Sequence, residues 1–144
     1  MNNNNTKELV DELNELLRGE RSAVETYDIT LDRFNDEPKL SYLRDIRREH
    51  LNAVNLLETR VRENGGTPSD DSGAWGTFAT TIQKTSSFFG PESAIDTLIR
   101  GEKHGISEYE DALESDIDAS TMSLIRETLL PSLRRHVVAL EAIE

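Results

Sequence analysis

Two segments of this chain repeat each other at a fixed distance, and this repeat restricts the fold more than any other feature of the sequence. Leu16–Arg21 reads LLRGER, and Leu98–Lys103 reads LIRGEK 82 residues later. Tyr27 and Tyr109 follow the two copies and are again 82 residues apart. A similarity at a constant spacing is the mark of one structural unit used twice. The 144 residues therefore suit one domain built from two such units.

Each copy is followed by a second similar segment, and this segment carries a histidine. His50 in the first unit corresponds to His136 in the second, 86 residues later, so the second unit has a turn about four residues longer. Apolar residues recur at spacings of three and four through all of these segments, which is typical of amphipathic helices. Each unit is thus predicted to be a helical hairpin, and the chain an all-α four-helix bundle.

Turn and capping residues give approximate boundaries for the helices. Residues 1–6 are expected to be frayed or disordered and residues 7–144 to form a single domain, with a linker helix at about 74–89. A connection of that length can run along the bundle, which would make the second and third long helices parallel, as in bundles with a crossover. The predicted long helices cover 7–34, 38–64, 91–114 and 118–144, with a bend at Pro131.

The composition excludes several classes of function. Sixteen basic and twenty-eight acidic side chains give a formal charge of −12, which disfavours nucleic acid and anionic membrane surfaces as partners. The chain has no cysteine, so thiolate-bound zinc and iron–sulfur clusters are excluded. No apolar stretch approaches the roughly 20 residues that span a bilayer, and the polar start lacks a secretory signal. We therefore expect a soluble, cytoplasmic protein.

A glutamate and a histidine in each hairpin are predicted to face each other. In an antiparallel hairpin, residues at equal distances from the turn lie at the same level. The position midway between Glu20 and His50 is residue 35, in the first predicted turn, and the position midway between Glu102 and His136 is residue 119, at the second. Packing the two hairpins together would then collect all four side chains near the middle of the bundle. Buried carboxylates require a cation or a proton-donating partner.

Two interpretations of this Glu/His layer stay open. Two carboxylates and two imidazoles from four helices suit one divalent transition metal, iron, manganese or zinc, bound by Glu20, His50, Glu102 and His136. Alternatively, the layer binds no metal, and Arg47, one turn before His50, neutralises the carboxylates in a structural ion-pair network. No residue is predicted to be catalytic.

Two tyrosines lie on the same helix faces as the glutamates. Tyr27 and Tyr109 each follow their glutamate by about two turns and could form hydrogen bonds into the layer, or could be ordinary core aromatics. Together with Arg47 they are the predicted neighbours of the site. Trp75 and Phe78 in the linker helix could cover the bundle or a second copy of the chain, so a homodimer is a candidate assembly.

Several of these motifs resemble a known family. The Leu-X-X-Gly-Glu start of each hairpin, Gly65-Gly66-X-Pro68, Ser72-Gly73-Ala74-Trp75-Gly76 and Leu130-Pro131 are similar to those of DUF2383, a bacterial group of uncharacterised ferritin-like four-helix-bundle proteins. The resemblance runs from about Leu9 onward, and it implies the ferritin-like fold without a settled activity.

The resemblance also bears on the metal. Ferritin-like proteins that bind two irons use a Glu from each of two helices and a Glu-X-X-His from each of the other two. Glu20 and Glu102 match the single glutamates, and His50 and His136 match the histidines. Arg47 and Leu133 replace the remaining glutamates, so the resemblance implies one metal ion or none rather than a pair. Arg47→Glu would be expected to restore one missing motif.

Overall fold

The computed structural model of the chain describes the backbone of residues 3–73 and 76–144 and the side chains of residues 5–73 and 90–144. All secondary structure in these ranges is helical. The elements in chain order are α1 (Asn3–Arg33), the 3₁₀ turn η1 (Pro38–Tyr42), α2 (Leu43–Glu63), α3 (Gly76–Leu113), α4 (Ala119–Leu124), the π-helical turn η3 (Ile125–Leu129) and α5 (Leu130–Ile143).

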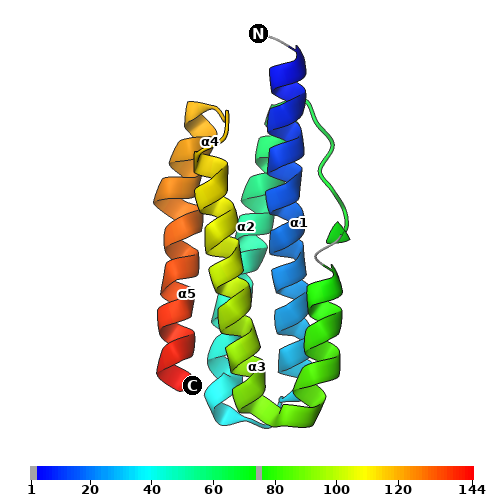
Figure 1. The fold of residues 1–144 in the computed structure, drawn as a ribbon, viewed down its shortest axis with the longest axis vertical. Coiled ribbons are helices and arrows are strands. Elements are labelled where there is room, and N and C mark those ends of the chain that lie inside the picture. Colours follow the sequence, from blue (N-terminus) through cyan, green and yellow to red (C-terminus); the bar gives the residue numbers. More distant parts are fainter. Residues whose placement is uncertain (1–2, 74–75) are drawn as a thin grey trace.

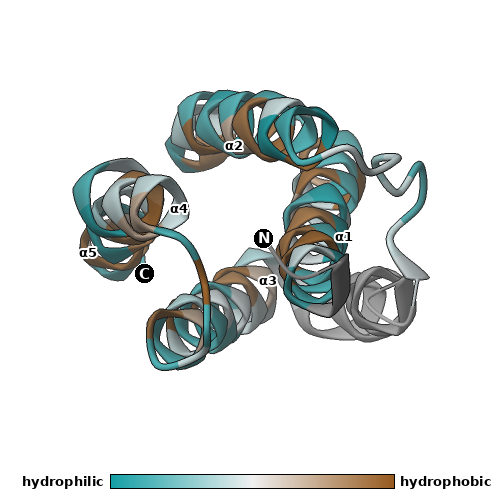
Figure 2. Cartoon of the chain, turned by 90° about the horizontal axis from the view of Figure 1, so that it is seen from above, coloured by the Kyte–Doolittle hydropathy of each residue, from teal (hydrophilic) through white to brown (hydrophobic). Residues whose placement is uncertain are grey.

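Four helices form a bundle around a common centre (Figure 1). α1 and α2 make one antiparallel hairpin, while the second half of α3 and the α4–α5 segment make the other. Figure 2 shows the order α1, α2, α5, α3 around the bundle, with polar residues mostly facing outward. α2 and the second half of α3 run in the same direction, because the connection between them returns along the side of the bundle.

A sharp kink at Gly90 separates the linker helix from the bundle. α3 continues through the predicted linker, but Gly90 has φ of 81° and ψ of −169°, which is not helical. That backbone region is open essentially only to glycine, and Pro91 can begin the next helix because the first turn needs no N–H donor. The helix entering the bundle thus begins at Pro91, where the sequence predicts it. Ala74 and Trp75 lie outside the described residues, as does the side chain of Phe78.

The remaining boundaries follow from capping chemistry. α1 begins at Asn3, four residues before the start at residue 7 that the sequence predicts. Asp118 caps α4 by accepting a hydrogen bond from the Thr121 backbone N–H, as expected at the start of the last helix. The bend predicted at Pro131 takes the form of η3 just before it. Proline cannot donate to the carbonyl four residues back, so the helix widens there instead of continuing regularly.

The segment after α2 is fastened to α1 by polar side chains. Asn14 donates to the Thr67 carbonyl and accepts from the Ser69 N–H, at 3.1 and 2.7 Å. Arg21 donates to the Ser69 carbonyl at 2.8 Å and pairs with Glu58 of α2. These bonds direct the chain down the outside of the first hairpin and account for the parallel α2 and α3.

The apolar core is divided into two blocks with a polar layer between them. One block contains Leu13 and Leu17 of α1 with Leu57 of α2, and the other contains Leu43 of α2 with Leu140 of α5. In every helix the predicted glutamate or histidine lies between residues of the two blocks. Among the described residues, no helix is both long and apolar enough to cross a membrane.

Candidate functional site

The structure brings together all four residues predicted to form the central layer. Glu20 of α1, His50 of α2, Glu102 of α3 and His136 of α5 are each buried. His50 is at the centre, with Nδ1 2.5 Å from Glu20 Oε2 and Nε2 2.6 Å from Glu102 Oε1. His136 Nδ1 is 3.2 Å from Glu102 Oε2, and the two imidazole rings are 4.9 Å apart between centroids. Each helix of the bundle therefore contributes one side chain.

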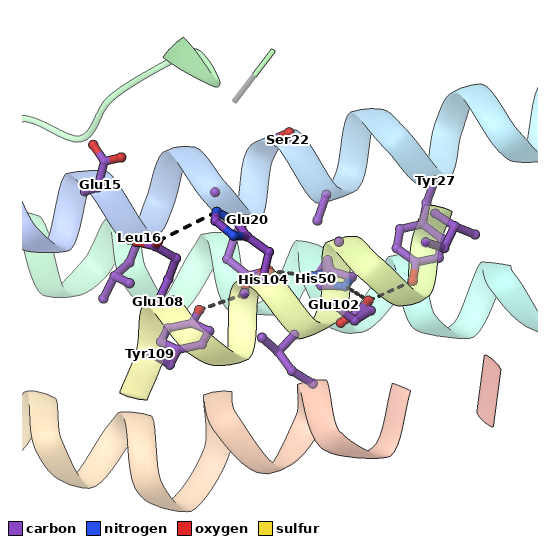
Figure 3. A pocket seen from close by; sticks show the side chains of 16 residues that line it. Glu15, Leu16, Glu20, Ser22, Tyr27, His50, Glu102, His104, Glu108 and Tyr109 are labelled. Atoms are coloured by element: carbon purple, nitrogen blue, oxygen red, sulfur yellow. Dashed lines mark hydrogen bonds and ion pairs between the residues drawn. The ribbon is translucent and has the colours of Figure 1, made fainter. Parts of the chain in front are cut away.

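The two tyrosines donate hydrogen bonds into the layer across the hairpins. Tyr27 of the first hairpin donates to Glu102 Oε1 of the second at 2.7 Å. Tyr109 of the second donates to Glu20 Oε1 of the first at 2.6 Å. The two bonds are related by the same repeat that relates the sequences. Figure 3 shows Glu20, His50 and Glu102 lying between the two tyrosines.

The buried groups shift one another's pKa values. For His50, burial lowers the pKa, but the charges of Glu102 and Glu20 and their hydrogen bonds outweigh burial and raise it well above the ordinary 6.5. For Glu102, burial raises the pKa, but His50 and His136 lower it to about 2. His50 is therefore an imidazolium that bridges two carboxylates when no metal is bound.

The tyrosines are kept protonated, because burial and the charge of the neighbouring carboxylates both raise their pKa values. Burial raises the pKa of Tyr27 well above 10.0, and the charge of Glu102 raises it further. Burial and then the charge of Glu20 do the same for Tyr109. Both phenols are thus fixed donors, and each occupies one oxygen of a buried carboxylate.

A third carboxylate, which the sequence interpretation missed, reaches the layer from its outer side. Glu49 Oε1 is 2.9 Å from His136 Nε2, and it accepts a hydrogen bond from Ser132 at 2.8 Å. Burial raises the pKa of Glu49, but its bonds to Ser132 and His136 and the nearby Arg135 lower it below its usual value. Helical periodicity places Glu49 on the flank of α2, so only its position next to His50 could have marked it.

The prediction that Arg47 points into the layer is wrong. Arg47 forms an ion pair with Asp28 of α1, and 34% of its side chain is exposed. With 3.6 residues per turn, Arg47 lies about 60° around α2 from His50, and the buried position one turn before His50 belongs to Ile46. Leu133, its counterpart in α5, is packed in the apolar core.

One family model matches most of the chain. A model described as "Domain of unknown function (DUF2383)" matches residues 8–115. The chain belongs to the DUF2383 family. No curated protein and no solved structure matches it. The DUF2383 match includes Glu20, His50 and Glu102 but ends before His136, so the fourth side chain of the layer lies outside the matched region.

Two cavities reach the layer of this DUF2383 protein from opposite sides. One, of about 70 Å³, lies between α1 and α3 (Figure 3). Its walls are mainly small or apolar: Leu16, Gly19, Ala23, Leu98, Gly101, Gly105 and Leu133. The other, of about 110 Å³, lies between α2 and α5, where Glu49, Asn52, Thr128 and Ser132 make its walls polar. Both reach Glu20 and His50, so the layer is within reach of small solutes.

Proposed function

We propose that the chain is a ferritin-like four-helix bundle that binds one divalent metal ion, iron, manganese or zinc, through Glu20, His50, Glu102 and His136. The observation that carries the proposal is the convergence of the donors. One ligand atom from each of His50, Glu102 and His136 lies within 4.8 Å of the others. Glu20 contacts the other nitrogen of His50, Nδ1, at 2.5 Å and lies outside this group of three, so its side chain would move to become the fourth ligand.

The donor set fits a transition metal in kind and in charge. Imidazole nitrogen and carboxylate oxygen together suit zinc, iron and manganese, and they do not favour calcium or magnesium, which prefer oxygen alone. Two carboxylates neutralise a divalent cation if both imidazoles are neutral. A buried site with this balance avoids the cost of an unpaired charge.

A small opening of the layer would accommodate the metal. Ligands at about 2.1 Å from a tetrahedral metal are about 3.4 Å from one another. His50 Nε2 is 2.6 Å from Glu102 Oε1, so these two side chains would separate by less than about 1 Å, while Glu20, at 2.5 Å from the other nitrogen, would move to the side of the cation. In the metal-free protein the proton on His50 Nε2 thus occupies the space that the cation would take.

The residues do not support a second metal of the Glu-X-X-His kind. Arg47 lies on the surface beside Asp28, and Leu133 is buried in the apolar core, so neither position supplies a carboxylate. A bound cation would act as a Lewis acid towards a small ligand in the adjoining cavities. The two tyrosines would fix the carboxylates that bind the cation, and the apolar blocks would limit the access of water to it.

A second candidate function is a structural layer that binds no metal. The short contacts of His50 to both carboxylates favour it, because an imidazolium between two carboxylates already satisfies its buried partners. In that case the layer would fix the register of the four helices, as buried polar groups do in some bundles.

Metal titration of protein purified without chelator or nickel resin separates the two candidates. Co²⁺ is the probe, because its visible absorption reports ligand number, and metal content after dialysis gives the stoichiometry. We expect one Co²⁺ per chain, with affinity at least about tenfold lower in His50→Gln and in His136→Gln, since loss of a ligand costs at least as much as loss of its supporting hydrogen bond.

His104→Gln is the matched control for this titration. The sequence has three histidines, and His104, which is 55% exposed, lies beside Glu108 on the wall of the cavity between α1 and α3. Its variant should bind Co²⁺ like the wild type. Wild-type protein that stays metal-free, or an equal loss in all three variants, would leave the structural layer as the function.

A further inference from the structure

Glu49 connects the buried layer to the surface between α2 and α5. It lies one residue before His50, yet its side chain contacts α5, with Oε1 2.9 Å from His136 Nε2 and 2.8 Å from Ser132 Oγ. The Glu49 side chain is 47% exposed, whereas that of His136 is 4% exposed. One nitrogen of the His136 ring therefore meets Glu49, and the other meets Glu102.

The contacts favour one nitrogen of His136 as the carrier of the proton in the neutral ring. The Ser132 hydroxyl donates its proton to Glu49, so it cannot donate to Nε2, from which it is 3.4 Å away. Ionised carboxylates only accept hydrogen bonds, and each ring nitrogen faces one: Nε2 is 2.9 Å from Glu49 and Nδ1 is 3.2 Å from Glu102, so the shorter contact favours the proton on Nε2. Nδ1 is then left with its lone pair facing Glu102 Oε2 at 3.2 Å.

We infer that Glu49 is a positioning residue, which holds the Nε2–H of His136 outward so that Nδ1 is presented to the divalent cation. The inference rests on the proposed function. Two acceptors facing each other, Nδ1 and Glu102 Oε2, are satisfied by a cation between them. Histidines that bind metals generally give their other N–H to a carboxylate or carbonyl, which fixes the tautomer and strengthens the ligand.

His50 has no carboxylate partner outside the layer among the described residues, which makes the two halves of the site unequal. Arg135 occupies in the second hairpin the position that Glu49 occupies in the first, because each directly precedes its histidine. Both nitrogens of His50 contact carboxylates of the layer itself. His50 must release one of them to bind a metal, whereas His136 already has its inner nitrogen available.

The orientation of His136 can be tested without any metal. ¹⁵N–¹H correlation spectra of the imidazoles distinguish a protonated ring nitrogen from one with a free lone pair. We expect the Nε2–H form in the wild type. In Glu49→Ala the Ser132 hydroxyl is freed to donate to Nε2 and Glu102 can accept from Nδ1, so the ring should change to the Nδ1–H form.

Metal affinity gives the second readout, with Glu110→Ala as the control. Glu110 is a carboxylate of similar exposure that pairs with Arg134 of α5 and does not touch the layer. Co²⁺ affinity should fall by about 10- to 100-fold in Glu49→Ala and stay near the wild-type value in Glu110→Ala. Glu49→Gln keeps an acceptor oxygen, so its Co²⁺ affinity should lie between those of the two alanine variants. Thermal unfolding verifies that each variant is folded.

The outcomes separate this inference from the proposal it rests on. The same tautomer in the wild type and Glu49→Ala, or equal affinities in Glu49→Ala and Glu110→Ala, would overturn the positioning role. A wild-type protein with the Nε2–H form that binds no Co²⁺ would overturn the metal function and still support the orientation of His136 by Glu49.

Discussion

Each of the two tyrosine hydroxyls donates a hydrogen bond to the buried glutamate of the opposite hairpin. Substitution by phenylalanine removes the hydroxyl and keeps the ring. Tyr27→Phe deprives Glu102 of a donor, and Tyr109→Phe deprives Glu20 of one. A hydrogen bond to a charged group contributes about 1.5–3 kcal/mol, so each variant should lower the free energy of unfolding by about that amount. Urea unfolding measures the loss.

Tyr42→Phe is the control for these two variants. Tyr42 is 51% exposed, and surface substitutions of this kind usually change stability by less than about 0.5 kcal/mol. Equal stability of all three variants would mean that the phenol bonds do not support the layer.

Individual positions show where the sequence suffices for the site and where it does not. The repeat and the midpoint argument locate Glu20, His50, Glu102 and His136 correctly in space, because the register of a helical hairpin follows from its turn. The predicted role of Arg47 was wrong. A residue three positions before His50 lies on the flank of α2, and there Arg47 forms an ion pair with Asp28. Glu49 was missed because its partners, Ser132 and His136, come from another hairpin.

At the scale of single elements, Gly90 is the position where one residue determines the path of the crossover. A Cβ at Gly90 would meet no described atom within 4 Å, so the cost of Gly90→Ala comes from the backbone, which has φ of 81° and ψ of −169°. Such strain costs about 1–3 kcal/mol. We expect thermal or urea unfolding to show a loss in this range, and an unchanged stability would mean that the kink is not required.

The elements differ in how well their sequence predicts them. Turns between the paired helices and the cap at Asp118 were predictable, because local residues suffice to end or begin a helix. The form of the bend before Pro131 was not, since a missing N–H indicates a disturbance without specifying a π-helical turn. The start of α1 at Asn3 was also missed, because polar asparagines have little helical preference of their own.

For the whole molecule, the layer makes stability depend on pH with a maximum in the acidic range. Glu102 has its pKa lowered from 4.5 to about 2, so its stabilisation is complete above about pH 4.5 and is lost as the pH falls towards 2. His50 has its pKa raised above 6.5, so its stabilisation is complete below 6.5 and is lost as the pH rises through the raised value.

The metal-free protein should therefore be most stable between about pH 4.5 and 6.5. Urea unfolding in the presence of EDTA across the pH range measures this maximum. His50→Gln should remove the decline on the alkaline side, and His104→Gln should retain it. A stability that keeps rising above pH 6.5 in the wild type would contradict the charged state of His50.

Metal should shift this maximum towards higher pH. Binding requires neutral imidazoles, so Co²⁺ competes with the His50 protons and stabilises the fold more as the pH rises. At a free Co²⁺ concentration about 100 times its Kd, the added stability would be about 2.7 kcal/mol. Thermal unfolding with and without Co²⁺ measures the shift; an increment that is independent of pH would place the metal elsewhere on the acidic surface.

The exchange of tyrosine hydroxyls between the hairpins has an evolutionary consequence. Neither hairpin can complete the layer alone, because the tyrosine that donates to each glutamate comes from the other hairpin. A single ancestral hairpin could have met this need by assembling with an identical copy through a twofold axis. Gene duplication and fusion would then have released the two halves from identity, and the opposite charges of Glu49 and Arg135 at equivalent positions are a change that only the fused chain permits.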